Sequence, residues 1–126
     1  MSAGDTKARD TNESSAFFAY LSRLRFIERW GLKRNTQREN VMEHSWEVAV
    51  IAHALATIRE AVFGRPVDAN AVAVAALFHD AAEVYTGDLP SPIKYHSAAI
   101  TSAYKAIELQ AQQDLHGLLP AALQQA

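Results

Sequence analysis

Apolar side chains recur at steps of three and four along most of the chain, which is the spacing of one face of an α-helix. This pattern predicts four principal helices, at about residues 17–29, 41–59, 69–80 and 96–115. No stretch shows the alternation of a half-buried strand, and no internal repeat is visible. The sequence therefore predicts an all-α fold.

Local signals mark where several of these helices begin and end. Asn40 is placed to cap the second helix, with Glu43 at its third position in a variant of the capping box, and Asp68 is placed to cap the third helix. Gly31 suits the end of the first helix. Two prolines and a glycine within residues 87–92 must end the third helix and reverse the chain.

The first fifteen residues differ in character from the rest. Residues 1–15 are polar, and we interpret them as a flexible leader, in which Ser14 or Ser15 could cap the helix that follows. Residues 16–126 are enough for one small domain with a single core. Residues 121–126 could begin a further helix.

Composition narrows the class of function. The formal net charge is −2, whereas a nucleic-acid-binding domain usually shows a strong basic excess, so we expect no nucleic-acid partner. The absence of cysteine excludes disulfides and thiolate metal sites. No apolar run approaches the roughly 20 residues of a membrane span, and the N-terminus lacks the apolar core of a secretory signal. We therefore expect a cytoplasmic protein without a membrane partner.

Residues 77–90 combine a histidine, three carboxylates and a chain reversal. The preceding run is almost wholly apolar, so we expect a buried helix that ends in His79 and Asp80. Buried charge is costly unless it is paired or bound to a metal. His44 lies on the expected apolar face of the second helix, with Val48, Ile51, Leu55 and Ile58. Two imidazoles and a carboxylate suit a divalent transition metal, although each histidine could also be a hydrogen-bonded core residue.

Other polar residues near the predicted ligands are candidates for catalysis or substrate binding. If the third helix continues for a turn, Glu83 projects to the side of His79 and Asp80, where it could orient or deprotonate a metal-bound water. An exposed glutamate at a helix end is the alternative. Arg29 and Trp30 combine a cation and a flat ring that suit a phosphate and a sugar or base, but Trp30 could equally anchor the first helix in the core.

Three ordered segments resemble the HD-domain phosphohydrolases. Residues 39–45, 78–84 and 86–95 read Glu-Asn-Val-Met-Glu-His-Ser, Phe-His-Asp-Ala-Ala-Glu-Val and Thr-Gly-Asp-Leu-Pro-Ser-Pro-Ile-Lys-Tyr. With Phe-Phe-x-x-Leu-Ser-Arg-Leu at 17–24 and the Arg29-Trp30 pair, they are most similar to the bacterial 5′-deoxynucleotidase branch. The resemblance extends from Phe17 to about Leu119.

This resemblance implies a fold, a cofactor and an activity. The fold is the α-helical HD domain, and the cofactor is one divalent transition metal such as cobalt or manganese. The activity is removal of phosphate from deoxyribonucleoside 5′-monophosphates, so the expected partner is a small nucleotide. By position, His44, His79 and Asp80 would be metal ligands, and Glu83 would assist the attacking water.

The resemblance also implies a substrate side of the pocket. Arg29 and Trp30 would line the phosphate and the sugar, with Trp30 helping to exclude a 2′-hydroxyl. Asp88 would contact the sugar, although a Gly-Asp pair often simply makes a turn. Lys94 matches in position, and it could contact an anion or be plain surface.

One departure from the family pattern concerns the metal. HD enzymes use a further aspartate ligand from a helix well downstream, and Asp114 comes too early to match it. We therefore expect either a fragment or a shortened homologue, lacking the C-terminal helices, with uncovered apolar surface and association into a homodimer or another assembly of copies. Two alternatives to the deoxynucleotidase stay open: a catalytically silent HD scaffold that binds metal or nucleotide, and an HD enzyme for another nucleotide.

Overall fold

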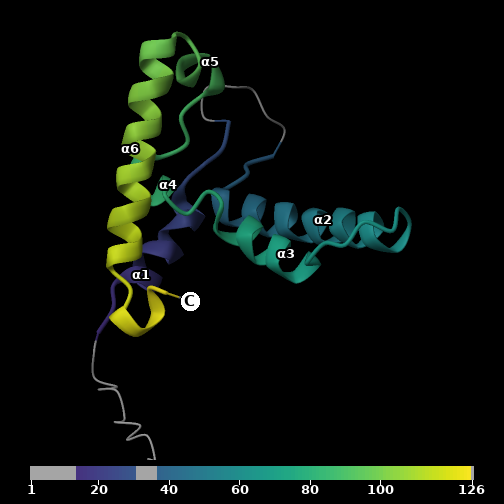
Figure 1. Ribbon diagram of the computed structural model, residues 1–126. Coiled ribbons are helices and arrows are strands. Elements are labelled where there is room, and N and C mark those ends of the chain that lie inside the picture. Colours follow the sequence, from purple (N-terminus) through teal and green to yellow (C-terminus); the bar gives the residue numbers. More distant parts are fainter. Residues whose placement is uncertain (1–13, 31–36, 126) are drawn as a thin grey trace, which may run out of the picture.

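In a computed structural model, residues 14–30 and 37–125 are described, and their regular elements are all helices, joined by irregular segments and one isolated antiparallel bridge between Glu28 and Asn40 (Figure 1). This confirms the predicted all-α class. Most of the predicted leader, and Gly31, lie outside the described residues. The elements in chain order are α1 (Phe17–Ser22), η1 (Arg23–Phe26), α2 (Val41–Ala61), α3 (Ala69–Phe78), α4 (Glu83–Thr86), α5 (Ser91–Lys94), α6 (Ala98–Gly117) and η2 (Ala121–Leu123).

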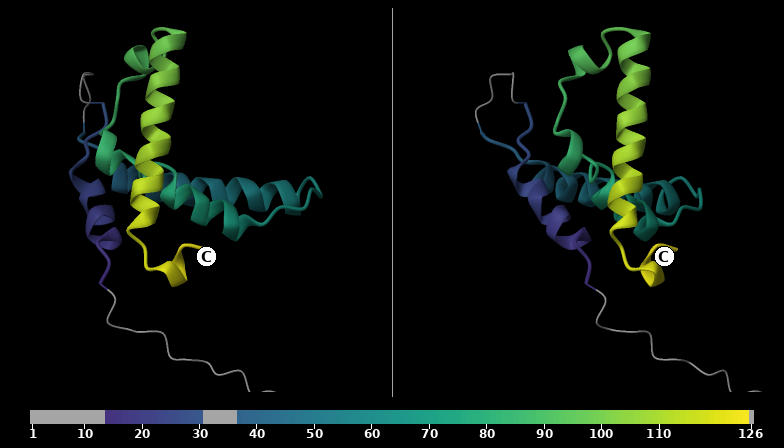
Figure 2. Two further views of the ribbon diagram at one scale, coloured as in Figure 1. Left: turned by 60° about the vertical axis from the view of Figure 1, so that its left-hand side comes forward. Right: turned by 90° about the vertical axis from the view of Figure 1, so that its left-hand side faces the viewer.

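The helices form two arms that meet at the short elements. In Figures 1 and 2, α2 and α3 lie side by side as a hairpin that extends away from the long α6. Helices α1, α4 and α5 all contact α6. No helix in the described part of the chain is long and apolar enough to cross a bilayer. The short helix α4 lies near the junction of the two arms and contacts α6 and η1.

A small core holds the junction together. Phe17, Ala81 and Leu115 are buried against one another, which joins α1, the turn before α4, and the C-terminal part of α6. Ser15 adds a polar contact, because its Oγ accepts a hydrogen bond from the Phe17 N–H at 3.2 Å and donates one to the Leu118 carbonyl at 2.7 Å. The turn after α3 is thus fixed from behind by apolar packing.

The predicted first helix ends earlier than expected. The α-helix stops at Ser22 and continues as a 3₁₀ turn to Phe26. The chain then runs extended, and two backbone hydrogen bonds pair it with the start of α2: Arg29 N–H donates to the Glu39 carbonyl at 2.8 Å, and Val41 N–H donates to the Ile27 carbonyl at 2.9 Å. A helix through Arg29 was therefore a wrong prediction, because non-local pairing takes these backbone groups.

The α2–α3 hairpin buries less than expected. Helix α3 has no buried residue, and the buried positions of α2 are mostly small, such as Ala49 and Ala56. Alanines let the two backbones approach, so larger apolar side chains of the predicted stripe remain outside the contact. Ile51 and Leu55 are 59% and 62% exposed. The prediction of a buried third helix was wrong, whereas uncovered apolar surface was expected and is present.

We predict that Asn40→Ala lowers the free energy of unfolding by about 1 kcal/mol, because the Asn40 side chain accepts a hydrogen bond from the Glu43 N–H at 2.9 Å at the start of α2. Urea unfolding followed by circular dichroism measures the change. Asn70→Ala is the matched control, since Asn70 is exposed inside α3 and should shift stability by less than about 0.5 kcal/mol. Equal effects of the two substitutions would contradict a capping role for Asn40.

Candidate metal and substrate site

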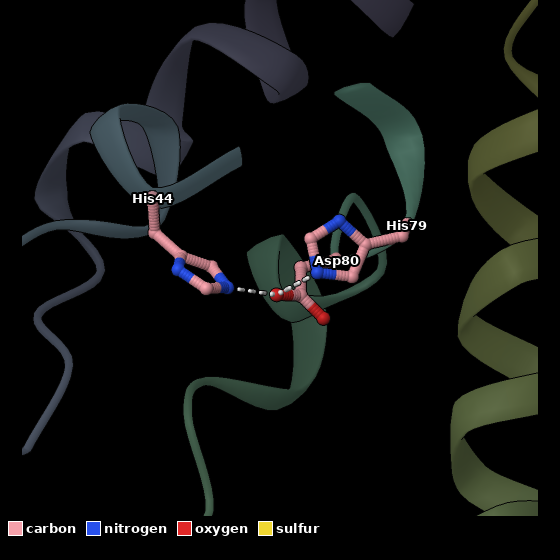
Figure 3. Close-up of side chains that lie close together, drawn as sticks. All are labelled: His44, His79 and Asp80. Atoms are coloured by element: carbon pink, nitrogen blue, oxygen red, sulfur yellow. Dashed lines mark ion pairs between the residues drawn. The ribbon is translucent and has the colours of Figure 1, made fainter. Parts of the chain in front are cut away.

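The three predicted metal ligands converge at the junction of the two arms. Figure 3 shows His44 pointing from α2 toward His79 and Asp80, which follow the end of α3. One Asp80 carboxylate oxygen, Oδ2, lies 2.9 Å from His79 Nε2 and 3.5 Å from His44 Nε2. One donor atom from each residue lies within 4.8 Å of the others. The predicted set is therefore brought together by the fold.

Backbone contacts orient the His79 ring toward this cluster. Its Nδ1 lies 2.6 Å from the Ala76 carbonyl oxygen, which can only accept, so Nδ1 carries a proton. In a neutral ring the lone pair then sits on Nε2, facing Asp80 Oδ2. A metal ion or a proton between Nε2 and Oδ2 would relieve the repulsion of their lone pairs. The arrangement is one that a metal ion stabilises.

The imidazole of His44 is also prepared to act as a donor. Burial lowers its pKa below the usual 6.5, the positive charge of Arg29 lowers it further, and Asp80 only partly opposes these effects. His44 is therefore neutral at pH 7, with a lone pair available for a metal. Together with the Asp80 carboxylate, the donor set fits a divalent transition metal. Asp114 is not part of it, because its Oδ1 accepts a hydrogen bond from Gln110 on α6.

Glu83 lies next to the cluster in an environment that opposes its ionisation. Burial is the largest cause, followed by the negative charges of Asp80 and Asp88, and the pKa of Glu83 rises to about 8. The cations Lys94 and Arg29 offset only part of this rise. The turn at residues 79–82 replaces the predicted continuous helix, yet Glu83 begins α4 close behind Asp80, and its N–H donates to the Asp80 carbonyl. It is thus placed to hold a proton beside the cluster at neutral pH.

A small pocket lies between this turn and α6. Helix α4 ends at Thr86 and is followed by the cap residue Gly87, which adopts φ 68°, and the chain reverses there so that α5 returns toward α6. Lys94 at the end of α5 places its ammonium 4.8 Å from the Tyr104 ring centroid. The pocket is lined by His79, Asp80, Ala82, Glu83, Thr86, Lys94, Tyr104 and Glu108.

Of the predicted substrate residues, Arg29 and Trp30 contact Glu39, whereas Asp88 lies near Glu83. Arg29 Nη1 and Trp30 Nε1 both donate to Oε2 of Glu39, at 2.9 and 3.1 Å, and the guanidinium lies 4.9 Å from the Trp30 ring centroid. Asp88 is near enough to raise the pKa of Glu83. Arg29 and Trp30 therefore adjoin the metal cluster through Glu39 rather than through direct contact with it.

Three residues around the site had no role in the sequence-based prediction. Glu39 contacts Arg29 and Trp30 directly, and the only local signal for it was its place one residue before the Asn40 cap. Tyr104 and Glu108 line the pocket from α6. Their spacing of four residues puts them on one helix face, but that pattern equally describes an ordinary amphipathic helix.

We predict that Glu83 makes the metal-free protein less stable as the pH rises. The unfolded chain loses this proton near the usual pKa of 4.5, whereas the folded protein holds it until about 8. The stabilising contribution is therefore complete below about pH 4.5 and is lost as the pH rises through about 8. Unfolding by urea in a chelating buffer, between about pH 5 and pH 8, measures this slope.

Glu83→Gln should flatten that slope, because the amide is neutral at every pH. The lowered pKa of His44 makes stability rise with pH, but His44 is present in both proteins. The difference between their two slopes therefore isolates the contribution of Glu83. Glu47→Gln, which changes an exposed glutamate of α2, should keep the original slope. Parallel profiles for the original protein and Glu83→Gln would show that Glu83 is not held protonated.

Comparison with known proteins agrees with this geometry. The chain is 54% identical over 112 residues to 5′-deoxynucleotidase YfbR from Escherichia coli O1:K1 / APEC, covering 89% of this chain and 56% of that protein. It is 55% identical over 108 residues to 5′-deoxynucleotidase YfbR from Shigella flexneri serotype 5b, covering 86% of this chain and 54% of that protein. The chain thus spans about half the length of the curated relatives it matches.

A solved structure shows the same fold. The crystal structure of an HD-domain phosphohydrolase from Listeria innocua superimposes with a TM-score of 0.75 at 30% identity, covering 86% of this chain and 51% of that one. This likeness confirms the predicted HD-domain helical fold. Residues 16–126 match the family described as 5′-deoxynucleotidase YfbR-like. Because the match covers most of the chain, the chain belongs to the 5′-deoxynucleotidase YfbR-like family.

Proposed function

We propose that this chain carries the metal- and nucleotide-binding part of a phosphohydrolase that removes phosphate from deoxyribonucleoside 5′-monophosphates. The observation that carries the proposal is the convergence of His44, His79 and Asp80 in one cluster, with Glu83, whose pKa is raised, beside it. Family membership supports it, because the named relatives are 5′-deoxynucleotidases. The products would be a deoxynucleoside and inorganic phosphate.

The proposed cofactor is one divalent ion, cobalt or manganese, held by His44, His79 and Asp80. A divalent ion in such a site supplies Lewis acidity toward a phosphoryl oxygen and toward a water molecule. The fixed Nδ1–H of His79 and the low pKa of His44 support the proposal, because both keep a nitrogen lone pair available. Nitrogen and carboxylate donors without thiolate suit ions of this class.

Glu83 would manage the proton during hydrolysis. A water oxygen forms a bond to phosphorus while the bond from phosphorus to the 5′-oxygen breaks, and the leaving oxygen must gain a proton. A carboxyl group with a pKa near 8 can hold a proton beside the reacting groups and exchange it near neutral pH. Glu83 would therefore orient the water and relay its proton to the leaving oxygen.

The remaining candidates would bind the nucleotide. Arg29 uses Nη1 for Glu39, which leaves other guanidinium donors for a phosphate. Trp30 would present its ring to the sugar and disfavour a 2′-hydroxyl, and Asp88 would accept a hydrogen bond from the sugar. Lys94 faces the same pocket as Glu83, where its charge would favour an anionic substrate.

The second candidate function is a silent scaffold that binds metal and nucleotide without releasing phosphate. The observation that favours it is that the described residues place three donors in the cluster, while Asp114 is engaged elsewhere.

We further propose that the protein acts in the cytoplasm and associates with copies of itself. Exposed apolar side chains on α2 and α3 support association, because large apolar patches commonly mark interfaces.

We predict that the chain binds Co²⁺, and that His44→Ala or His79→Ala lowers the affinity at least tenfold, because each removes a nitrogen donor. The visible absorption of bound cobalt, titrated at pH 7.5, measures the affinity. His53→Ala is the matched control, since His53 is exposed on α2 and lies outside the cluster. A similar loss in His53→Ala, or none in the other two, would exclude this metal site.

We predict metal-dependent phosphate release from deoxyadenosine monophosphate, and its loss in Glu83→Ala with cobalt affinity nearly unchanged. The reason is that Glu83 would act on the proton and not on the metal. Phosphate release is measured with added Co²⁺ or Mn²⁺ and with chelator. Turnover in Glu83→Ala equal to that of the original protein would refute its role.

Binding of cobalt and nucleotide without any release of phosphate would favour the silent scaffold. Equal release from ribo- and deoxyribonucleotides would weaken the role given to Trp30.

A further inference from the structure

The carboxylate of Glu39 lies where the two halves of the candidate site meet. Its Oε2 accepts hydrogen bonds from Arg29 Nη1 and from Trp30 Nε1, and its Oε1 lies 3.8 Å from His44 Nδ1. One side chain thus contacts both proposed substrate-binding residues and faces a proposed metal ligand. We infer that Glu39 is a positioning residue that sets the geometry of Arg29, Trp30 and His44 together, an inference that rests on the proposed function.

The contacts of Glu39 are built into the fold rather than made by chance at the surface. Its side chain is 28% exposed, and those of Arg29 and His44 are 22% and 18% exposed, so solvent screens these interactions less than at an open surface. The backbone of Glu39 is paired with that of Arg29, and Asn40 next to it caps α2. The backbone that carries the Glu39 side chain is therefore fixed on both sides.

The backbone of Trp30 adopts a conformation that contacts with neighbouring residues must stabilise. Its φ is 63°, in the left-handed region, and it is the one non-glycine residue there in the described chain. A bulky residue adopts this region at a cost, and it persists only where the surroundings over-determine it. The hydrogen bond from Trp30 Nε1 to Glu39 and the stacking of Arg29 on the indole supply such constraints.

Two chemical consequences follow for the site. With one carboxylate oxygen shared by Arg29 and Trp30, the guanidinium and the indole are fixed relative to each other, and the remaining guanidinium donors are directed elsewhere. A rigid indole can reject one extra hydroxyl on a sugar, whereas a mobile one would yield to it. On the other side, a carboxylate facing His44 Nδ1 favours the tautomer that is protonated there, which leaves Nε2 for the metal.

Trp30 fluorescence tests the positioning role without any substrate. The chain has two tryptophans, and Trp46 is 63% exposed, so Trp46→Phe leaves Trp30 as the only indole. In that background Glu39→Ala should lower the steady-state anisotropy of Trp30, and Glu39→Gln, which keeps an acceptor oxygen, should restore part of it. Glu28→Gln is the matched control. It removes the carboxylate of a bridge residue next to Arg29, one that pairs with exposed Arg38 instead.

Binding measurements separate positioning from a merely structural role. Glu39→Ala should lower the affinity for deoxyadenosine monophosphate about tenfold and the affinity for the ribonucleotide less. The ratio of the two affinities should therefore narrow. In a Trp30→Phe background, Glu39→Ala should narrow the preference no further. Cobalt affinity should fall several-fold, less than in His44→Ala. Circular dichroism confirms that each variant is folded.

Unchanged Trp30 anisotropy in Glu39→Ala would overturn the inference. So would equal weakening of both nucleotides, because that is what a general structural defect produces. If the unsubstituted protein binds no nucleotide, the proposed function fails, but the anisotropy and cobalt comparisons still decide whether Glu39 positions Trp30 and His44.

Discussion

The site depends on the approach of two imidazoles to one carboxylate oxygen. Asp80 Oδ2 faces His79 Nε2 at 2.9 Å and His44 Nε2 at 3.5 Å, and these residues come from the two sides of the α2–α3 pairing. Each partner is held by a separate device. The Asn40 cap begins the helix that carries His44, the Ala76 carbonyl orients His79, and the core around Ala81 fixes the turn next to Asp80. Several local features of the fold thus position the residues of one cluster.

Burial and the charges around this cluster together explain the raised pKa of Glu83. Burial is the largest cause, and the negative charges of Asp80 and Asp88 add to it, so that the pKa rises to about 8. Lys94 and Arg29 oppose this only in part. A pocket that concentrates carboxylates in this way favours a cation at its centre. The same excess would repel the proposed anionic substrate, so the proposed function needs a bound divalent ion and nearby basic side chains together.

Short-range features of the chain were predictable from the sequence, and long-range ones were not. Asn40 and Asp68 cap their helices as predicted, because a cap needs only a few neighbouring residues. The predicted end of the first helix was wrong, since the Arg29 backbone pairs with Glu39 across a loop. The prediction that α3 is buried was wrong, because close contact through alanines leaves its larger side chains outside the α2–α3 interface. The convergence of His44, His79 and Asp80 was expected from residue type and resemblance, whereas the three contacts of Glu39 arise only after folding.

The arrangement also separates the proposed metal ligands from the proposed substrate-binding residues. The cluster uses donors from α2 and from the turn after α3, whereas Arg29 and Trp30 are set by an extended segment and by Glu39. Glu39 accepts hydrogen bonds from Arg29 and Trp30, whereas its Oε1 lies 3.8 Å from His44 Nδ1, which is longer than a hydrogen bond. Its influence on the metal is therefore electrostatic and weaker than its influence on the indole. Loss of Glu39 should accordingly loosen the substrate side first, since that side has hydrogen bonds to lose.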